Sequence, residues 1–328
     1  MEKGTAQKGE RRMNAVIKVE SLEHVYGGKV RALDGVDFEV NEGEIFGVLG
    51  PNGAGKTTLV KILSTLLVPT KGSVYIKGID ILKNPRRIKR VINVCFGGDQ
   101  GLYWNLTGRE NLAYFMELYR CPRKVRRRRI EELIEFTKLG EKADALVRTY
   151  SAGMKQRLQI ARALVNDPEI VYFDEPLVSL DVHFVEEVIS LMRSLAERGK
   201  TLVVTTHSTS LAERVCNRVL LLDRGRVLFC GNIYELSKML RKVLVRLKVH
   251  GINKEIQAKL RNGLPCGRPR VKKRSAQEAE LQWLCSSWRE ALALSQELSR
   301  ENWDDNLEAL EVKLPPLKDL FLEMFHEP

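Results

Sequence analysis

The segment "EIFGVLGPNGAGKT", Glu44 to Thr57, decides the fold. A short apolar run is followed by a glycine-rich turn and then by the helical pattern "KTTLVKILSTLL". "GPNGAGKT", Gly50 to Thr57, matches the P-loop pattern in the strand–turn–helix context that gives the match its meaning. We expect its backbone N–H groups to surround phosphates, Lys56 to reach the β and γ oxygens, and Thr57 to offer an oxygen to Mg²⁺. The segment therefore predicts an α/β protein that binds a nucleoside triphosphate.

Composition and charge narrow the class of protein. The 328 residues have ordinary globular composition, with 44% hydrophobic residues, and suffice for one large domain and a smaller one. Lys and Arg number 54 against 42 for Asp and Glu, and the net charge of +12 favours acidic partners such as nucleotides, nucleic acid or an anionic membrane face. The six cysteines form no CxxC pair, so we expect neither a zinc site nor a disulfide framework, and a reducing compartment fits best. Because the sequence shows neither a signal-peptide core nor an apolar run long enough for a membrane span, we expect a soluble chain.

The organisation along the chain predicts two domains. Up to about residue 230, apolar runs such as "EIVYFDEP" and "KTLVVTTH" alternate with helical patterns, which indicates a largely parallel sheet. A helical insert is expected from about Thr107 to Lys138, and "VLLLDRGRVLFCG" is expected to be a hairpin. Two helical faces are expected, one made by Leu59, Leu63, Leu66 and Leu67, and one by Leu281, Leu284, Trp288, Leu292 and Leu298. We predict a disordered tail over 1–13, a main domain over 14–240, and a small α+β appendage over 241–328.

Two further strands end in residues suited to phosphate chemistry. In "IVYFDEP" we expect Asp174 to hold Mg²⁺ and Glu175 to act as the base toward the attacking water, the alternative being a solvated loop start. His207 ends "TLVVTTH", a strand expected beside the P-loop strand, within reach of a γ-phosphate. A satisfied structural histidine is the alternative there. These positions predict one site at the carboxyl edge of the sheet.

A second phosphate-binding element is predicted in "YSAGMKQRLQIARAL", Tyr150 to Leu164. Small residues stand at the start of a helix, whose unpaired N–H groups and positive partial charge can hold an anion. Asp181 follows the acidic pair closely enough to line the same site, or simply caps the next helix. Tyr26 offers a planar ring on which a base can stack.

The basic run "RCPRKVRRRRIEEL", Arg120 to Leu133, is best read as a solvated helix start. Its charges fall on every side of the expected helix, and it has no interleaved aromatics for base stacking. Nucleic-acid binding and attraction to an anionic membrane surface are the two alternatives.

Together these motifs resemble the ATP-binding subunit of an ABC transporter, over about Val16 to Leu240. The matching elements are the A-loop at Tyr26, Walker A at Gly50 to Thr57, the signature at Tyr150 to Met154, Walker B at Ile170 to Glu175, the D-loop at Ser179 to Asp181, and the switch histidine at His207. The "YSAGM" form and the ending "LEVKLPPLKDLFLEM" are similar to the drug-exporter and antibiotic-resistance type with its C-terminal appendage.

The resemblance implies the site residues and shows two departures. The implied catalytic residues are Glu175, His207 and Lys56, and the implied magnesium ligands are Thr57 and Asp174. The implied ATP contacts are Tyr26, Asn52, Gly53, Ala54, Gly55, Lys56, Thr57, Thr58, Ser151, Gly153 and Asp181. Ala152 and Met154 replace the commoner Gly and Gln of the signature. The position of the family's Q-loop glutamine falls on Gly98, so either Gln100 serves from a shifted position or Asp99 takes over the metal contact.

The resemblance also implies a function. In the family, two subunits pack head to tail, so that the signature of one closes over the ATP held by Walker A of the other. We therefore expect a P-loop ATPase that couples ATP and Mg²⁺ to export, as a homodimer with a separately encoded transmembrane permease on which the insert from about Gly98 to Tyr119 pushes. It would lie in the cytoplasm, peripheral to the inner face of the membrane through the permease, with no stable nucleic-acid partner. The alternative is a soluble ABC-type ATPase acting on ribosomes or nucleic acid.

Overall fold

The described part of the chain forms two units. In the computed structural model, residue contacts place the boundary between Gly231 and Asn232. The residues described are 15–97, 101–177, 180, 182–233, 235–236, 242–250, 266, 269–273, 278–300, 307–317, 319 and 321. The predicted tail, 1–13, and the predicted boundary at 240 lie outside them.

A six-stranded sheet forms the centre of the first unit, in the order β10-β9-β3-β8-β7-β6. Its strands are β3 (Ile45–Leu49), β6 (Ile92–Phe96), β7 (Ile170–Asp174), β8 (Thr201–Thr206), β9 (Arg218–Asp223) and β10 (Arg226–Gly231). Strands β9, β3, β8, β7 and β6 pair in parallel, and β9 and β10 form the predicted antiparallel hairpin. Every residue of β3, β7 and β8 is buried, as expected for apolar runs covered on both faces. The predicted α/β fold with a largely parallel sheet is confirmed.

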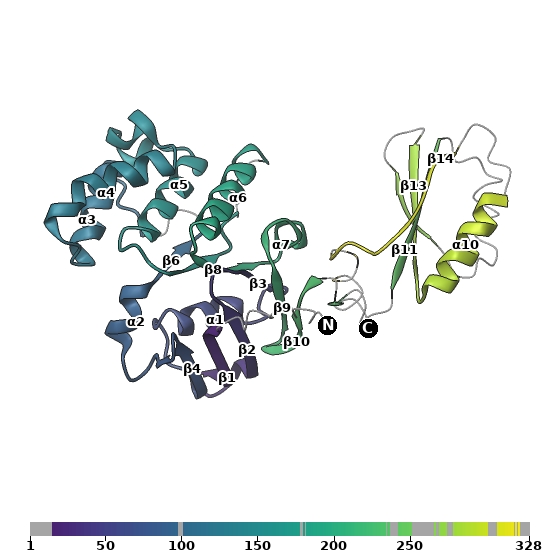
Figure 1. The fold of residues 1–328 in the computed structure, drawn as a ribbon, viewed down its shortest axis with the longest axis horizontal. Helices are drawn as coiled ribbons and strands as arrows, with labels where there is room; N and C mark the ends of the chain where they lie inside the picture. The colour runs from purple at the N-terminus through teal and green to yellow at the C-terminus, as the bar shows by residue number, and fades with distance from the viewer. Residues whose placement is uncertain are drawn as a thin grey trace, which may run out of the picture. The chain divides into compact units, whose positions relative to one another are not determined.

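Two hydrophobic cores lie on opposite faces of this sheet. Ile170 and Tyr172 of β7 pack into the core formed with helix α1, whereas Val171 and Phe173 pack into the core formed with the later helices. The α1 side also holds a smaller antiparallel sheet and α2, visible at the bottom of the first unit in Figure 1. Its elements are β1 (Ala15–Tyr26), β2 (Val30–Asn41), α1 (Lys56–Leu63), β4 (Lys71–Ile76), β5 (Ile79–Asp80) and α2 (Pro85–Val91).

The apolar helical face predicted for α1, made by Leu59, Leu63, Leu66 and Leu67, is partly wrong. Leu59 and Leu63 are fully buried, but the helix ends at Leu63 and Thr65 takes a left-handed conformation with φ 61°. Leu66 therefore lies beyond the helix, with 59% of its surface exposed.

The other core is covered by the helical part of the first unit, which confirms the predicted insert (Figure 1). Its helices are α3 (Gly108–Leu118), α4 (Arg123–Phe136), α5 (Ala152–Ala163), α6 (Val182–Glu197) and α7 (Thr209–Val215), with 3-10 turns at Gly140–Asp144 and Val147–Thr149. Helix α3 begins with a capping box in which the Thr107 hydroxyl accepts from the Glu110 N–H and the Glu110 carboxylate accepts from the Thr107 N–H. None of the helices in the described ranges is both long and apolar enough to span a bilayer.

The second unit is a small α+β domain. Its described residues form an antiparallel sheet in the order β12-β13-β11-β14 and a helix of 13 residues. The elements are β11 (Val243–His250), β12 (Arg270–Lys273), β13 (Glu278–Cys285), α10 (Trp288–Arg300) and β14 (Leu307–Lys313).

The helical face predicted across this region is wrong for four of its five residues and right for Leu298. Leu281 and Leu284 lie in β13, because "EAELQWLC" turns every second residue toward the core around the fully buried Trp283. Leu298 is buried on α10, but Trp288 and Leu292 are about half exposed.

Two cysteines of the second unit form a disulfide, so the expectation that the cysteines form no disulfide is wrong for this pair. Cys266 and Cys285 are bonded with their Cα atoms 5.4 Å apart, although 19 residues separate them. A separation of 19 positions in the sequence does not indicate a disulfide, because only the fold brings the two cysteines together. Cys95, Cys121 and Cys216 remain thiols.

Candidate functional site

The P-loop connects β3 to α1 and requires glycine for packing. A Cβ at Gly50 would lie 2.2 Å from the Leu222 carbonyl oxygen, and one at Gly55, where φ is 107°, would lie 2.4 Å from that of Ala32. Lys56 opens α1 with its side chain buried, and its Nζ donates to the carbonyl oxygens of Gly50 at 2.8 Å and Pro51 at 3.1 Å. Carbonyl oxygens of the P-loop thus hold the Lys56 amine in place.

Glu175 lies where β7 ends, in a left-handed conformation with φ 50°. Only a few per cent of non-glycine residues adopt such a backbone, and they cluster at functional sites. Its N–H donates to both the carbonyl oxygen and the hydroxyl of Thr205 on β8, at 3.2 and 3.1 Å. These bonds hold the strained backbone in place.

The Glu175 carboxylate contacts the other two residues expected to be catalytic, Lys56 and His207. Its Oε1 lies 3.4 Å from Lys56 Nζ, and its Oε2 lies 3.0 Å from His207 Nδ1. His207 follows β8, which pairs with β3 as predicted, and its side chain is exposed. A carboxylate between an amine and an imidazole, at the mouth of a phosphate-binding loop, is suited to accept a proton from water.

Asp174 and Thr57 form the expected magnesium-binding pair. The Asp174 Oδ1 accepts from Thr205 Oγ1 at 2.5 Å and from Thr57 Oγ1 at 3.5 Å. Mg²⁺ is commonly held by one or two protein oxygens, with phosphates and water completing its six ligands. One carboxylate and one hydroxyl fit that donor set, although the described residues hold no cluster of three or more His, Cys, Asp or Glu that could bind a metal.

Tyr26 lies beside the start of α1. Its hydroxyl is 3.3 Å from Thr58 Oγ1, and its ring, 40% exposed, meets the His24 ring edge-on at 4.5 Å. The ring is therefore fixed and still accessible to a flat ligand. Asn52 and Gly53 are exposed at the tip of the P-loop, whereas Ala54 is buried.

The signature residues lie on a different part of the molecule. Ser151 caps α5, accepting from the Met154 N–H at 3.3 Å, and is exposed. Gly153 faces Phe184 of α6 so closely that a Cβ would lie 2.4 Å from that ring. Because α5 packs into the core on the sheet face opposite α1, these two residues do not join the group around Lys56.

Comparison with known proteins decides the family. A sequence family described as ABC transporter matches residues 33–178. The daunorubicin/doxorubicin resistance ATP-binding protein DrrA of Streptomyces peucetius is 36% identical over 242 residues, which cover 74% of this chain and 73% of that protein. The chain belongs to the ABC transporter family of ATP-binding proteins. This ABC protein is an ATPase.

Other relatives and structures agree with the assignment. The ABC transporter ATP-binding protein NatA of Bacillus subtilis (strain 168) is 35% identical, covering 68% of this chain and 93% of that protein. The Nod factor export ATP-binding protein I of Ralstonia nicotianae is 38% identical, covering 67% and 68%. The ATP-binding cassette MJ0796, a dimer in a post-hydrolysis state with ADP and Pi, is similar with 31% identity and a TM-score of 0.60, over 66% of this chain and 98% of that one. CbiO1 from Clostridium perfringens is 26% identical with a TM-score of 0.62, over 69% and 94%.

Sequence reasoning missed two residues of this ABC ATPase site. Thr205 bonds both Asp174 and Glu175, yet in "TLVVTTH" it reads as an ordinary strand residue. Gly97 donates its N–H to the Asp174 carbonyl at 2.9 Å, and a Cβ there would lie 2.3 Å from the Glu175 carbonyl oxygen. Asp181 and both Q-loop candidates, Asp99 and Gln100, lie outside the described residues.

Proposed function

We propose that this ATPase is the energy-coupling subunit of an exporter, acting with Mg²⁺ as a head-to-tail homodimer on a separate transmembrane permease. The relatives named for daunorubicin resistance and Nod factor export support the exporter assignment. The observation that carries the enzymatic part is the Glu175 carboxylate lying between Lys56 Nζ and His207 Nδ1.

The proposed roles follow from these contacts. Glu175 accepts the proton of the attacking water, and His207 orients that carboxylate through the bond at Oε2. Lys56 exchanges its carbonyl partners for the β and γ oxygens of ATP, while the ring of Tyr26 stacks on the base. When bound by Asp174 and Thr57, Mg²⁺ would neutralise charge on the same phosphate oxygens.

The separation of the two anion-binding elements supports the head-to-tail arrangement. Ser151 and Gly153 stand at the start of α5, and Lys56 stands at the start of α1, across the sheet from it. A helix start that is exposed and cannot reach the ATP of its own chain is free to contact the ATP of a second chain. The dimeric MJ0796 cassette offers a precedent for pairing of such domains.

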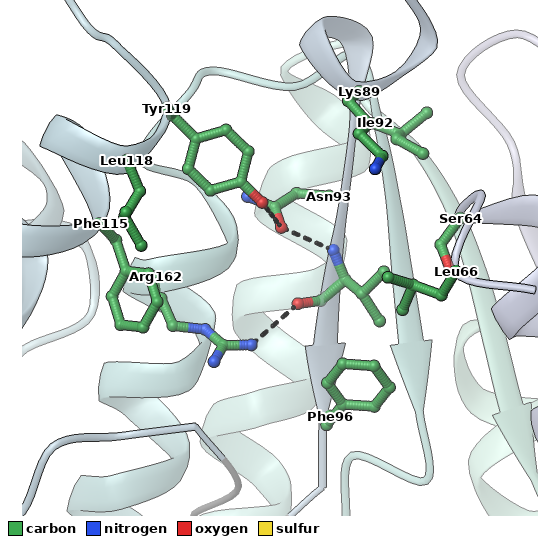
Figure 2. Close-up of a pocket in the computed structure, with 11 residues that line it drawn as sticks. Ser64, Leu66, Lys89, Ile92, Asn93, Phe96, Phe115, Leu118, Tyr119 and Arg162 are labelled. Atoms are coloured by element: carbon green, nitrogen blue, oxygen red, sulfur yellow. Dashed lines mark hydrogen bonds between the residues drawn. The ribbon is translucent and has the colours of Figure 1, made fainter. Parts of the chain in front are cut away.

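A cavity in the first unit is the proposed contact for the permease. It has a volume of about 390 Å³ and lies between β6, the end of α3 and the segment after α1. Figure 2 shows Phe115, Leu118 and Tyr119 along one side and Leu66 along the other. The Arg162 guanidinium supports this wall, lying 5.0 Å from the Phe115 ring and donating to the Val94 carbonyl at 3.4 Å.

We propose that an apolar cytoplasmic segment of the permease enters this cavity, since aromatic walls fit apolar side chains. The segment from 101 to 119, part of the insert expected to push on the membrane partner, contributes three of its lining residues. Docking there would hold the ATPase at the cytoplasmic face of the membrane.

The test of the proposal combines two defective chains. Lys56→Ala removes the amine of the P-loop, and Ser151→Arg places a guanidinium where the neighbour's γ-phosphate would lie. Both chains also carry Glu175→Gln so that trapped ATP survives. Each homodimer has two defective sites, whereas the mixed dimer has one whole site, so occlusion of labelled ATP should return on mixing.

Two results would contradict this reading. If heterodimers form, as differential tags report, but occlude no more ATP than either homodimer, both elements act within one chain. Because Ser151→Arg also removes a helix cap, Ser287→Arg serves as a matched control, removing the cap that Ser287 gives to Glu290 in the second unit. A comparable loss in that control would assign the Ser151 effect to stability alone.

A further inference from the structure

Two helices of the first unit carry exposed basic side chains that have no acidic partner within the described ranges. They are Arg86, Arg87 and Arg90 on α2 and Arg123, Lys124 and Arg127 on α4. Within the described ranges, no carboxylate oxygen lies within 4 Å of their charged nitrogens. The neighbouring arginines differ, since Arg126 pairs with Glu117 and Arg129 with Asp167.

At the start of α4 the charges of Arg123 and Lys124 work against the stability of the helix, whereas α2 has only seven residues and Arg90 lies in its last turn. A helix N-terminus carries a partial positive charge, which favours acidic residues in the first turn. Neither α2 nor α4 has an acidic residue there, and neither has a side-chain cap. The arrangement therefore suits an external anion better than it suits the isolated fold.

Helix α2 and the residues shortly before α4 border one cavity, the one proposed to receive the permease. Lys89 of α2 lines it together with Leu118 and Tyr119, which lead directly into α4 (Figure 2). The Tyr119 hydroxyl donates to Asn93 Oδ1 at 2.9 Å, and Asn93 Nδ2 donates to Asn166 Oδ1 at 2.7 Å. Asn166 in turn donates to the Ile92 carbonyl at 3.1 Å, directly after α2. The end of α2 and the segment that leads into α4 thus lie beside the same cavity.

Exposed apolar side chains lie among the charges. Leu82, just before α2, is 50% exposed, Leu118 is 58% exposed, and Val125 within α4 is 49% exposed. Clustered Lys and Arg with interspersed apolar groups are the chemistry that binds an anionic bilayer surface. Sequence-tolerant binding of single-stranded nucleic acid would instead call for aromatic rings between the cations, and no aromatic residue lies between the cations of either helix.

We infer that Arg86, Arg87, Arg90, Arg123, Lys124 and Arg127 form a membrane-binding surface, the basic rim, whose ligands are the phosphate groups of anionic lipids. This inference rests on the proposed function in one respect: a permease docked in the cavity would place the bilayer next to the basic rim. The binding itself requires no permease. It adds a second, electrostatic attachment to the membrane beside the protein contact.

The test uses the full chain without any permease. Sedimentation with vesicles of phosphatidylcholine alone, or of phosphatidylcholine and phosphatidylglycerol at three to one, measures the partition coefficient. One variant carries Arg86→Gln, Arg87→Gln and Arg90→Gln, and another carries Arg123→Gln, Lys124→Gln and Arg127→Gln. The matched control carries Lys138→Gln, Lys142→Gln and Arg224→Gln, three exposed cations outside the rim.

We expect binding to the anionic vesicles only, lost at high salt, and each rim variant to bind at least about tenfold more weakly, since a cation near such a surface contributes roughly fivefold. The control should bind as the wild type does, and all variants should keep ATP affinity. Unchanged binding by either rim variant, equal binding to neutral vesicles, or an equal loss in the control would overturn the inference. So would tight binding of duplex DNA that the rim variants abolish while vesicles do not bind. The ATP-occlusion test uses no lipid, so failure of one proposal does not entail failure of the other.

Discussion

Replacing Gly97 by alanine tests whether the position of the Glu175 carboxylate sets the rate of hydrolysis. The new Cβ would lie 2.3 Å from the Glu175 carbonyl oxygen and 3.3 Å from that of Asp174. Both neighbours are backbone atoms, and ordinary contacts begin at 3.4 Å. The end of β6 and the residue after β7 must therefore separate by about 1 Å.

The magnitude follows from that displacement. A misplacement of about 1 Å in a catalytic group can cost on the order of 100-fold in rate, and overpacking costs about 1 to 3 kcal/mol of stability. The Lys56 amine is held by the carbonyl oxygens of Gly50 and Pro51, away from the new methyl group. We expect Gly97→Ala to lower kcat about 100-fold while ATP affinity stays within about threefold.

The assay is steady-state phosphate release at saturating Mg-ATP, with affinity from a fluorescent ATP analogue and stability from urea unfolding. Gly199→Ala is the matched control, because its φ of 81° strains an alanine while no atom lies within 4 Å of the new Cβ. It should lose stability with kcat unchanged. A kcat for Gly97→Ala within threefold of the wild type, at comparable stability, would refute the link between Gly97 and Glu175.

Three further predictions concern single side chains. Glu175→Gln should bind ATP normally, stop turnover and accumulate an ATP-bound dimer in light scattering, because only the base is removed; a protein that stays monomeric would argue against it. Tyr26→Ala should weaken ATP binding about tenfold or more, whereas Tyr26→Phe keeps the ring and should bind nearly as the wild type does in the same fluorescence titration. Burial raises the pKa of the Cys95 thiol to about 12, so at pH 8 iodoacetamide should label Cys95 only after unfolding, as mass spectrometry of its peptide would show. Labelling of the folded protein would contradict that burial.

The positions of the site residues were predictable, but their geometry was not. Apolar strands, the P-loop and the acids at the end of β7 carry local patterns, so the sequence indicated which edge of the sheet they share. The left-handed backbone of Glu175 and its contact with Gly97 depend on the pairing of β6 with β7, whose partner residues are 78 positions apart, and no local pattern records them.

The second unit shows the limits of periodicity. Leu281, Leu284 and Trp288 fall at helical intervals, yet the same letters around Leu281 also alternate as a strand. Pairing of β13 with strands on both sides decided between the two. The disulfide between Cys266 and Cys285 depends on that same pairing, so it was equally hidden.

The left-handed backbone of Glu175 lowers the stability of the fold, whereas its carboxylate is needed for ATP hydrolysis. At φ 50° glycine is the residue without steric cost, and the two bonds that the Glu175 N–H donates to Thr205 hold a conformation that glutamate resists. A library of this protein selected for heat resistance alone should therefore enrich glycine at position 175, giving chains that fold more firmly and still bind ATP but no longer consume it. The strained glutamate after β7 is thus a place where the chain gives up stability to remain an enzyme.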